Sequence, residues 1–509
     1  MEVLLLVLTI SLPLLLLFKL GNYYVRNLNP RPPGPRGLPL IGHMHKFDSL
    51  NTHLYLYKLS QKYGPLMSLQ LGSVRILVIS SARAAKEVFK YHDLCFSSRP
   101  TSLGLQKISY NGSDIAFAPY SLYWRDMRKL CTLHLFSSQR SQSFQPIREG
   151  EVARMVRAIR DEAAAGSSTV NLSKILTNLT SSVIFRITFG KRYDQEEEYG
   201  ARNDTKNKIS NKFHWLLTET QANLSSLFLA DCFPLMGHLI DRLSGAWSRL
   251  EKSCNEIDAI YQQLIDEYLH TPAIASTRDD GSILDILLQM KKDSSDFTFD
   301  HIKAILMNVL VAATDASAAA VVWAMTLLIK NPTPMKKVQQ EVRDLIGKKG
   351  FVDENDVQKL VYLKAVVKEA MRLHPPSPLL LPRETIDKCV INGYQIEAKT
   401  RVYVNAYAIG RDPECWDNPD EFLPERFMNS SIDFRGQHFE LIPFGTGRRI
   451  CPGISMGVAT TELALANLLY SFNWELPPGK DRKDIDMAAL PGITMHKKNH
   501  LCLVPVIVN

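Results

Sequence analysis

Few features of this sequence set it apart from an ordinary globular protein. Its 509 residues include only eight cysteines, widely spaced and without a C-x-x-C pair. This argues against a disulfide framework and predicts mostly free thiols in a reducing compartment. The chain has no basic run interleaved with aromatic residues, so we expect no nucleic-acid partner. It also has no internal repeat and no low-complexity tract.

The composition that remains can bury a large core. Hydrophobic residues make up 45% of the chain and charged residues 22%, an ordinary globular balance. The formal net charge of +8 is a modest basic excess. Such an excess is consistent with an acidic membrane surface or an acidic protein partner.

An apolar run from residue 3 to residue 18 opens the chain. It is short for a membrane span, so a cleaved signal peptide is the competing interpretation. Basic residues follow the run, Glu2 is the only charge before it, and no small-residue cleavage site follows. This asymmetry favours an uncleaved anchor over residues 1–20 with its C-terminal side in the cytosol. Prolines and glycines then predict a stiff, basic hinge over residues 21–42.

A glycine-rich loop near the C-terminal end, residues 443–453, carries Cys451 and two arginines, Arg448 and Arg449. The apolar pattern of residues 454–472 predicts a helix directly after it. Unpaired N–H groups and the dipole at a helix start favour negative charge, so we expect the thiol of Cys451 to ionise. The arginines suit carboxylates or phosphates. A buried structural cysteine in a tight turn is the alternative.

A second long helix is predicted over residues 301–330, about 45 Å at 1.5 Å per residue. Its length would suit a membrane span. Asn308, Asp315 and Ser317 oppose that interpretation, because an aspartate in mid-membrane is costly. On another predicted helix, Trp124 and Arg128 lie four apart and share a face.

Local patterns predict the remaining elements. A strand hairpin is expected over residues 66–79, a helix over 82–91 and a long loop over 101–120. Residues 151–294 are expected to be mainly helical, with a break at 231–234. A helix over 363–374 should end before Pro375. Strands are expected within 388–404, and a turn with a strand within 490–498.

The spacing of five residues in the glycine-rich loop resembles the haem-binding loop of the cytochrome P-450 family. These residues are Phe444, Gly447, Arg449, Cys451 and Gly453. Other family motifs follow the family's order, from about Pro32 to the C-terminus. The resemblance therefore implies one mainly α domain with small β-sheets over residues 43–509, behind the anchor, rather than the roughly three domains that length alone suggests.

The resemblance also implies roles around a haem b. Cys451 would be the axial thiolate of the iron, a ligand that favours O–O cleavage. Phe444 would shield the sulfur, and Gly445 and Gly447 would let the backbone turn and approach the porphyrin. Haem propionates would be reached by Arg449, Trp124, Arg128 and Arg383. Glu369, Arg372 and Arg426 would form a buried ion network that holds the cysteine loop.

The central helix departs from the family pattern, Ala/Gly-Gly-x-Asp/Glu-Thr-Thr/Ser. Asp315 supplies the acid, but Ala313 replaces the glycine and Ala316 replaces the threonine that helps carry protons to dioxygen. Three alternatives remain open. Ser317 or Thr314 holds a water in place of the missing hydroxyl, the substrate supplies its own hydroxyl or oxime, or the reaction is an isomerisation or dehydration without a proton relay.

The function implied is an NADPH- and dioxygen-dependent monooxygenase in the endoplasmic reticulum membrane, single-pass and facing the cytosol. Electrons would come from an NADPH-cytochrome reductase, which Arg125 and Lys129 would face. The substrate would be a small hydrophobic plant metabolite. Its pocket would include Ile115, Ala312, Ala313, Leu380, Ile493 and Thr494. An alternative of another class is a non-catalytic haem-binding protein.

Several stretches look plant-like: the proline-rich hinge, residues 96–100, and the two arginines before Cys451. Residues 318–323 and the pair Lys497 and Lys498 are similar to plant enzymes that oxidise aldoximes derived from amino acids. Related plant enzymes act on terpenoids, alkaloids and phenolics. The sequence alone does not choose among these substrates.

Overall fold

The structure is a computed structural model that describes residues 30–165, 169–192, 215–224, 226, 228–234, 236–270 and 281–508. The predicted anchor, 1–20, and the first part of the hinge, 21–29, lie outside the described residues.

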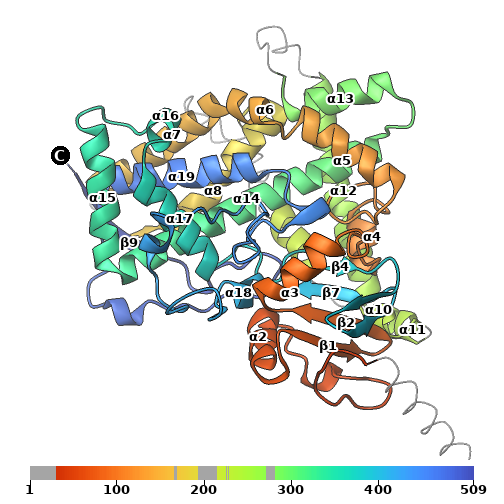
Figure 1. Cartoon of the computed structure of the whole chain (residues 1–509). Helices are drawn as coiled ribbons and strands as arrows, with labels where there is room; N and C mark the ends of the chain where they lie inside the picture. Colours follow the sequence, from red (N-terminus) through yellow and green to blue (C-terminus); the bar gives the residue numbers. More distant parts are fainter. Residues whose placement is uncertain are drawn as a thin grey trace, which may run out of the picture.

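Helices make up most of the described chain and surround one long central helix (Figure 1). This confirms the expected mainly α architecture. The α-helices are α2 (Thr52–Tyr63), α3 (Ala82–Lys86), α4 (Leu103–Ile108), α5 (Leu122–His134), α6 (Ser138–Ser143), α7 (Gln145–Ala164), α8 (Leu172–Phe189), α10 (Leu229–Cys232), α11 (Gly237–Leu243), α12 (Ala246–His270), α13 (Ile283–Asp293), α14 (Phe299–Lys330), α15 (Pro332–Ile346), α16 (Glu354–Val357), α17 (Val361–Leu373), α18 (Ala406–Ile409) and α19 (Ile454–Ser471).

The strands form three small sheets, with orders β1-β2-β7-β4, β3-β9-β8 and β5-β6. The predicted hairpin is β1–β2, in register from Leu66 opposite Ile79 to Leu71 opposite Val74. The strands expected within 388–404 divide between two sheets, because β7 pairs with β2 in parallel while β5 and β6 pair only with each other. Strand bounds are β1 (Leu66–Leu71), β2 (Val74–Ile79), β3 (Val170–Asn171), β4 (Arg383–Glu384), β5 (Cys389–Ile391), β6 (Tyr394–Ile396), β7 (Arg401–Val404), β8 (Phe472–Glu475) and β9 (Cys502–Ile507).

The central helix α14 is the only described helix long and apolar enough to cross a membrane, and 78% of its most apolar window is buried inside the protein. It packs against α8, α19 and α17 in the middle of the molecule (Figure 1). A helix covered by other helices is apolar on nearly every side, which explains its continuous hydrophobic sequence. The prediction of a core helix rather than a second span is therefore confirmed.

Two local predictions were wrong. Residues 101–120 contain a helix, α4, rather than a continuous loop, because Leu105 and Ile108 bury in the main core and the Leu103 N–H donates to the carboxylate of Asp231 at 3.0 Å. The strand expected within 490–498 is only a bridge between Ala489 and Lys497. The next strand along the chain is β9, the middle strand of the β3-β9-β8 sheet. Both outcomes depend on partners remote in sequence, which a local pattern does not contain.

The described part of the hinge is non-helical, as predicted, and lies against β1. The N–H of Ser68 donates to the carbonyl of Pro33 at 2.8 Å, and the Ser68 hydroxyl donates to that of Pro32 at 2.7 Å. A Cβ on Gly34 would lie 2.0 Å from the Ser68 carbonyl oxygen, so only glycine fits this approach. Residues 30–42 are therefore docked on the β1–β2 sheet.

The predicted ion network is present, with Glu369 and Arg372 fully buried and the Arg426 side chain 11% exposed. Glu369 accepts from Arg372 at 2.7 and 2.8 Å and from Arg426 at 3.1 Å, and the Glu369 and Arg372 side chains are 0% exposed. Arg372 also donates to the carbonyls of Pro419 and Glu421, and the Leu423 N–H donates to Glu369. These bonds fasten the 410–423 segment, whereas we expected them to hold the cysteine loop. The motifs fix which side chains pair but not which backbone they reach.

Replacing Glu369 by glutamine should lower the free energy of unfolding by about 3–5 kcal/mol, because two buried guanidinium groups then lack a carboxylate. Denaturant unfolding of the purified chain measures this. The matched control is Lys252→Ala, which removes an exposed pair with Glu256 at 3.9 Å and should cost less than about 1 kcal/mol. Similar small losses in both variants would contradict the buried role of Glu369.

Candidate active site

A cavity of about 300 Å³ lies between α14 and the cysteine loop. Its wall is mainly apolar, and Cys451 is the only cysteine that lines it among the described residues. All six predicted pocket residues lie in this wall: Ile115, Ala312, Ala313, Leu380, Ile493 and Thr494. The structure thus brings together segments from the whole length of the chain around one thiol.

The cysteine loop is held by its own backbone. The Cys451 N–H donates to the carbonyl of Phe444 at 2.9 Å, and the Thr446 hydroxyl donates to that of Gly436 at 2.7 Å. Gly445 has φ +72°, a left-handed conformation that favours glycine, and it lines the cavity as expected. The Phe444 ring also lines the cavity and packs edge-on against Phe434 at 5.3 Å.

Gly447 does not line the cavity, contrary to expectation. It has φ +66°, and a Cβ there would lie 2.2 Å from a carboxylate oxygen of Asp93. Asp93 accepts from the backbone N–H and the side chain of Arg448, at 3.0 and 2.9 Å, and from Arg383 at 3.3 Å. Gly447 therefore makes room for Asp93, a residue that the sequence patterns did not mark.

Burial raises the pKa of the Cys451 thiol, whereas the helix start led us to expect an ionised thiol. The hydrogen bond from the Gly453 backbone and the charge of Arg128 act in the opposite direction and are outweighed. The free-energy cost of removing water from a thiolate is larger here than the stabilisation that one N–H group and one guanidinium group provide. A metal ion bound to such a thiol deprotonates it, so an iron held by Cys451 would favour the thiolate form.

Four buried or largely buried guanidinium groups line the cavity: Arg99, Arg128, Arg383 and Arg449. Burial, followed by mutual repulsion, lowers the pKa of Arg449 to about 9, and burial lowers that of Arg383 to about 10. The carboxylates that act on these groups belong to Asp93 and Asp114. The cluster therefore keeps an excess of positive charge that suits a prosthetic group with two carboxylates, and a haem has that composition.

Each arginine is oriented by backbone carbonyls. Arg449 donates to the carbonyls of Ser97 at 2.7 Å and Ala118 at 2.6 Å, and Arg383 donates to that of Thr446 at 2.6 Å. Arg128 donates to the carbonyl of Ile450. Fixed in this way, their remaining N–H groups can face a carboxylate in the cavity.

Trp124 does not line the cavity, although we expected it to contact a haem propionate. It packs against Arg449 of the arginine cluster instead. Its indole N–H donates to the carbonyl of Ile115 at 3.0 Å, and the guanidinium of Arg449 lies 3.8 Å from its ring centroid. Arg99 is a residue that the sequence reasoning missed. It donates to the carbonyls of Ala116, Leu381 and Pro382 at 2.7–2.8 Å.

On the opposite wall, Ala312, Ala313, Ala316 and Ser317 of α14 line the cavity. Asp315 does not, because it points to another side of the helix. Thr314 is fully buried and also absent from the wall, so it is not placed to hold a water in the cavity. Of the two hydroxyls considered as substitutes for the missing threonine, only that of Ser317 faces the cavity.

The carboxylate of Asp315 is linked to the cavity through Gln221, which the sequence did not mark. The Gln221 amide donates to Asp315 at 2.8 Å and to the Thr494 hydroxyl at 3.3 Å. The ring of His496 lies 3.7 Å from the same carboxylate. Gln221 and Thr494 both line the cavity.

An acid–amide clamp positions the loop that carries Ile115. The Asn308 amide donates to the Asp114 carboxylate at 2.9 Å, and its oxygen accepts from the N–H groups of Ile115 and Ala116 at 3.1 and 3.2 Å. Asp114 also accepts from the N–H of Phe117. Burial raises the pKa of Asp114, and these donors oppose that shift. A polar residue in an apolar helix was the only sign of this clamp.

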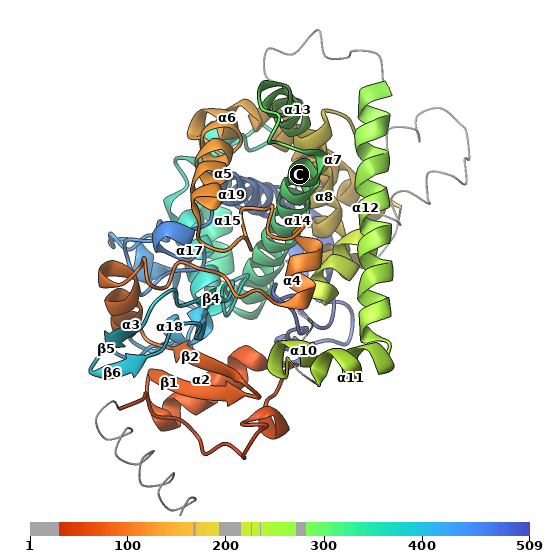
Figure 2. The same cartoon turned by 90° about the vertical axis from the view of Figure 1, so that its right-hand side faces the viewer.

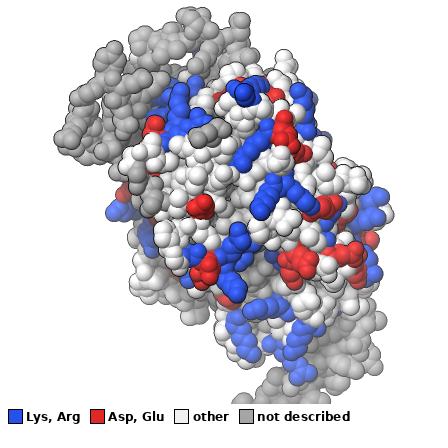
Figure 3. Space-filling view, turned by 90° about the vertical axis from the view of Figure 1, so that its left-hand side faces the viewer, with Lys and Arg blue, Asp and Glu red and all other residues white. Residues whose placement is uncertain are grey.

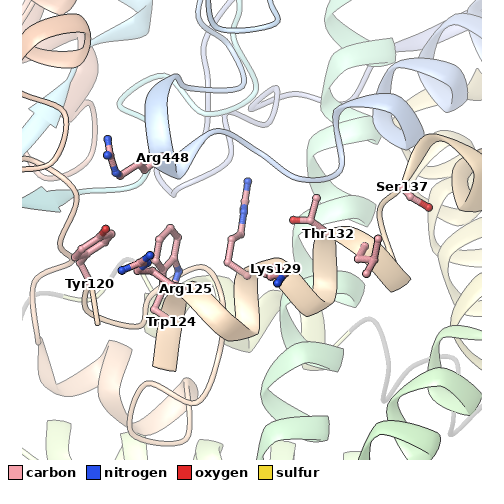
Figure 4. Close-up of a pocket in the computed structure, with 9 residues that line it drawn as sticks. Tyr120, Trp124, Arg125, Lys129, Thr132, Ser137 and Arg448 are labelled. Atoms are coloured by element: carbon pink, nitrogen blue, oxygen red, sulfur yellow. The ribbon is translucent and has the colours of Figure 1, made fainter. Parts of the chain in front are cut away.

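A hollow beside α5 is lined by four basic residues: Arg125, Arg128, Lys129 and Arg448. Figure 4 shows Arg125 and Lys129 on α5 beside it, with Arg448 of the cysteine loop across from them. Arg125 and Lys129 are exposed. A different face, drawn in Figure 3, has basic and acidic residues interspersed. Arg128 lines both this hollow and the cavity, so the α5 hollow adjoins the arginine cluster.

Three comparisons with known proteins agree with this geometry. The family model Cytochrome P450 matches residues 32–504. The chain is 49% identical to 5-OH-xanthotoxin synthase of Pastinaca sativa, covering 93% of this chain and 92% of the relative. It is 45% identical to strychnine-11-hydroxylase of Strychnos nux-vomica, covering 93% and 91%. A zebra fish cytochrome P450 solved with abiraterone shares the fold, with a TM-score of 0.72 and 24% identity over 90% of this chain and 99% of that one.

The chain belongs to the cytochrome P450 family. It is a haem-dependent monooxygenase of the kind found in plant specialised metabolism, and the family's haem is held by a cysteine thiolate. The buried thiol and the excess of guanidinium groups in one cavity fit that cofactor. The resemblance to aldoxime-oxidising enzymes stays a prediction.

Gly447→Ala should lower the amount of haem retained per purified chain. The alanine would have to keep the left-handed backbone conformation of residue 447, which costs about 1–2 kcal/mol, and its Cβ would collide with the Asp93 carboxylate. Pigment absorbance per mole of protein measures the loss. Gly347→Ala is the matched control, since Gly347 is also left-handed with φ +55°, its Cβ would meet nothing within 4 Å, and it does not line the cavity. Full haem content in Gly447→Ala would contradict the tight fit to Asp93.

Proposed function

We propose that this enzyme inserts one oxygen atom of dioxygen into a small hydrophobic plant metabolite, and that Cys451 would hold the iron of its haem. The haem supplies dioxygen activation, and a thiolate ligand favours O–O cleavage. The observation that carries the proposal is one mainly apolar cavity lined by Cys451, by four guanidinium groups and by the central helix α14. In this proposal Arg128, Arg383 and Arg449 hold the haem carboxylates.

The mainly apolar wall supports a hydrophobic substrate of limited size. Ile115, Ala312, Ala313 and Ile493 give it methyl and alkyl surfaces, while Gln221 and Asn308 add polar groups at defined points. Relatives of this chain are named for products or substrates related to xanthotoxin, trihydroxycoumarin and strychnine. We infer a rigid, mostly apolar substrate with a few oxygen or nitrogen atoms.

The missing threonine hydroxyl at position 316 is replaced, in this proposal, by a water that Ser317 holds. Ser317 lines the cavity one residue beyond Ala316, and its oxygen lies near α19, 3.9 Å from where a Cβ of Gly457 would be. Asp315, reached through Gln221, would hold the proton further from the cavity. Proton transfer to dioxygen needs such a defined path.

The exposed bases of α5 are the proposed docking site of an acidic NADPH-cytochrome reductase. Arg125 and Lys129 flank the hollow, which lies outside the cavity on the cysteine-loop side (Figure 4). Electrons delivered there would have a short path to Cys451. Complementary charge steers such encounters more than it sets their affinity.

A membrane location is supported by exposed apolar residues on one side of the molecule. Met236, Leu239 and Leu243 of the α11 region are 67%, 59% and 80% exposed, and Leu40 of the hinge is 88% exposed. Both segments meet the β1–β2 turn, because the N–H of Gly72 donates to Ile41 and that of Ser73 to Cys232 before α11 (Figure 2). Such a patch suits a lipid surface. We propose the endoplasmic reticulum membrane with the catalytic domain in the cytosol.

Microsomes containing the full chain and a reductase should convert at least one member of a panel of coumarins, alkaloids, terpenoids, phenolics and aldoximes. The product should be heavier by one oxygen atom, and its formation should require NADPH. Mass spectrometry with labelled dioxygen measures both. A product formed equally well without NADPH would contradict the proposal and favour the isomerase or dehydratase alternative.

Ser317→Ala should lower the product formed per NADPH consumed by roughly tenfold or more, since a positioned proton donor contributes about 10²–10⁴-fold. Ala316→Thr should raise this ratio. Thr314→Val is the matched control, because its hydroxyl lies outside the cavity, and it should leave coupling unchanged. Unchanged coupling in Ser317→Ala would rule out the water held by Ser317.

Lys129→Glu should raise the reductase concentration needed for half-maximal turnover several-fold, with the greatest effect at low salt. Lys252→Glu, an exposed lysine of α12 away from the hollow, is the control. Titration of reductase against turnover measures both variants. Equal effects of the two substitutions would place the docking surface elsewhere.

A further inference from the structure

We propose that Cys95 and Cys389 form a dithiol that hydrogen peroxide closes to a disulfide, tying the β5–β6 hairpin to the segment that supports Arg449. All eight cysteines are free in the structure. These two are the ones whose thiols hydrogen-bond to each other. The inference does not depend on the proposed substrate or reductase.

The two cysteines lie on segments that run side by side although they are 294 residues apart in sequence. The N–H of Ile386 donates to the carbonyl of Cys95 at 2.8 Å, and that of Glu384 donates to Ser98 at 2.9 Å. The Cys95 thiol lies 3.1 Å from the carbonyl oxygen of Asp387. Backbone bonds therefore hold the two segments together without any disulfide.

The pair is chemically asymmetric. The hydrogen bond from Cys389 lowers the pKa of the Cys95 thiol to about 7, and backbone hydrogen bonds of Asp387 and Ile386 add to this. Burial and the charge of the Asp387 carboxylate act in the opposite direction and are outweighed. The same hydrogen bond raises the pKa of Cys389. Near neutral pH, Cys95 thus supplies a large thiolate fraction and Cys389 stays a thiol. A reactive thiolate beside a resolving thiol is the arrangement that converts peroxide into a disulfide.

Other thiols of the chain lack this combination. Cys415 is exposed, yet burial of its sulfur and nearby carboxylates raise its pKa to about 11. Burial raises the pKa of Cys254 to about 11 as well. If exposure alone decided reactivity, Cys415 would be the most reactive thiol. Because the thiolate is the reactive form, we expect Cys95 to react first.

The reaction balances with hydrogen peroxide as the oxidant. The Cys95 thiolate attacks one peroxide oxygen, the O–O bond breaks, and a sulfenic acid and hydroxide form. The Cys389 sulfur then attacks the Cys95 sulfur, an S–S bond forms, and water leaves. In sum, two thiols and one peroxide give one disulfide and two waters. Peroxide is the two-electron reduction product of dioxygen, so an oxygenase with poor coupling generates this oxidant itself.

The disulfide would act on the arginine cluster. Cys95 precedes Ser97, whose carbonyl accepts from Arg449 at 2.7 Å, and Arg99, which lines the cavity. Cys389 begins β5, three residues after the contact of Ile386 with Cys95. A covalent tie between these segments restrains the carbonyl that orients Arg449. The oxidised protein should therefore release its haem more slowly to a haem-accepting protein.

The test uses the purified full-length holoprotein, first reduced and freed of reductant, then treated with a few equivalents of hydrogen peroxide. Iodoacetamide under denaturing conditions blocks the remaining thiols, and trypsin is applied without reductant. We expect the peptide of residues 91–107 joined to that of residues 389–399, two hydrogens lighter, and released by dithiothreitol. Cys95 and Cys389 alkylated as completely as Cys415 would overturn the proposal.

Two variants separate the roles of the thiols. In Cys389→Ser, the cross-link should disappear and dimedone should label Cys95 after peroxide. Cys415→Ser is the matched control and should form the disulfide as the unaltered chain does. A cross-link that persists in Cys389→Ser would contradict the pairing. Equal rates of haem release from the oxidised and reduced protein would contradict the tie to Arg449.

Discussion

Positive charge buried without enough negative charge is the constraint on which this structure depends. Four guanidinium groups line one mainly apolar cavity, and burial lowers the pKa of Arg449 and Arg383. Burying several positive charges without matching negative charge is costly in free energy, so a negatively charged ligand in the cavity would stabilise this cluster. Cys451 lines the same cavity, and burial raises the pKa of its thiol, which an iron bound to the sulfur would counter. A haem supplies both its carboxylates and its iron.

The rest of the fold holds the four guanidinium groups and the Cys451 thiol in place. Backbone carbonyls of the 95–99 and 115–118 segments orient the arginines, and the Asp114–Asn308 clamp fixes the second of these segments to α14. The left-handed glycines of the cysteine loop let it pass Asp93 and turn toward the cavity. The Glu369 network holds the segment before that loop rather than the loop itself.

The sequence predicted what depends on local pattern and missed what depends on remote partners. Apolar periodicity located α14 and α19, and the β1–β2 hairpin followed from alternation around Gly72. The cysteine loop carried the family resemblance because its spacing is fixed. The sequence did not predict the roles of three residues in the site, Asp93, Arg99 and Gln221. Each acts through a contact with a residue more than 90 positions away or with a backbone carbonyl. Helical geometry, applied residue by residue, would have placed Asp315 beside the cavity rather than on its wall.

The most direct test of this account is the absorbance of the purified chain, with and without carbon monoxide, before and after Cys451→Ser. The account predicts a pigmented protein whose carbon-monoxide spectrum is that of a thiolate-ligated haem. It further predicts that this spectrum is lost in Cys451→Ser and kept in Cys254→Ser. A colourless unaltered chain, or a spectrum that survives the loss of the Cys451 sulfur, would contradict it.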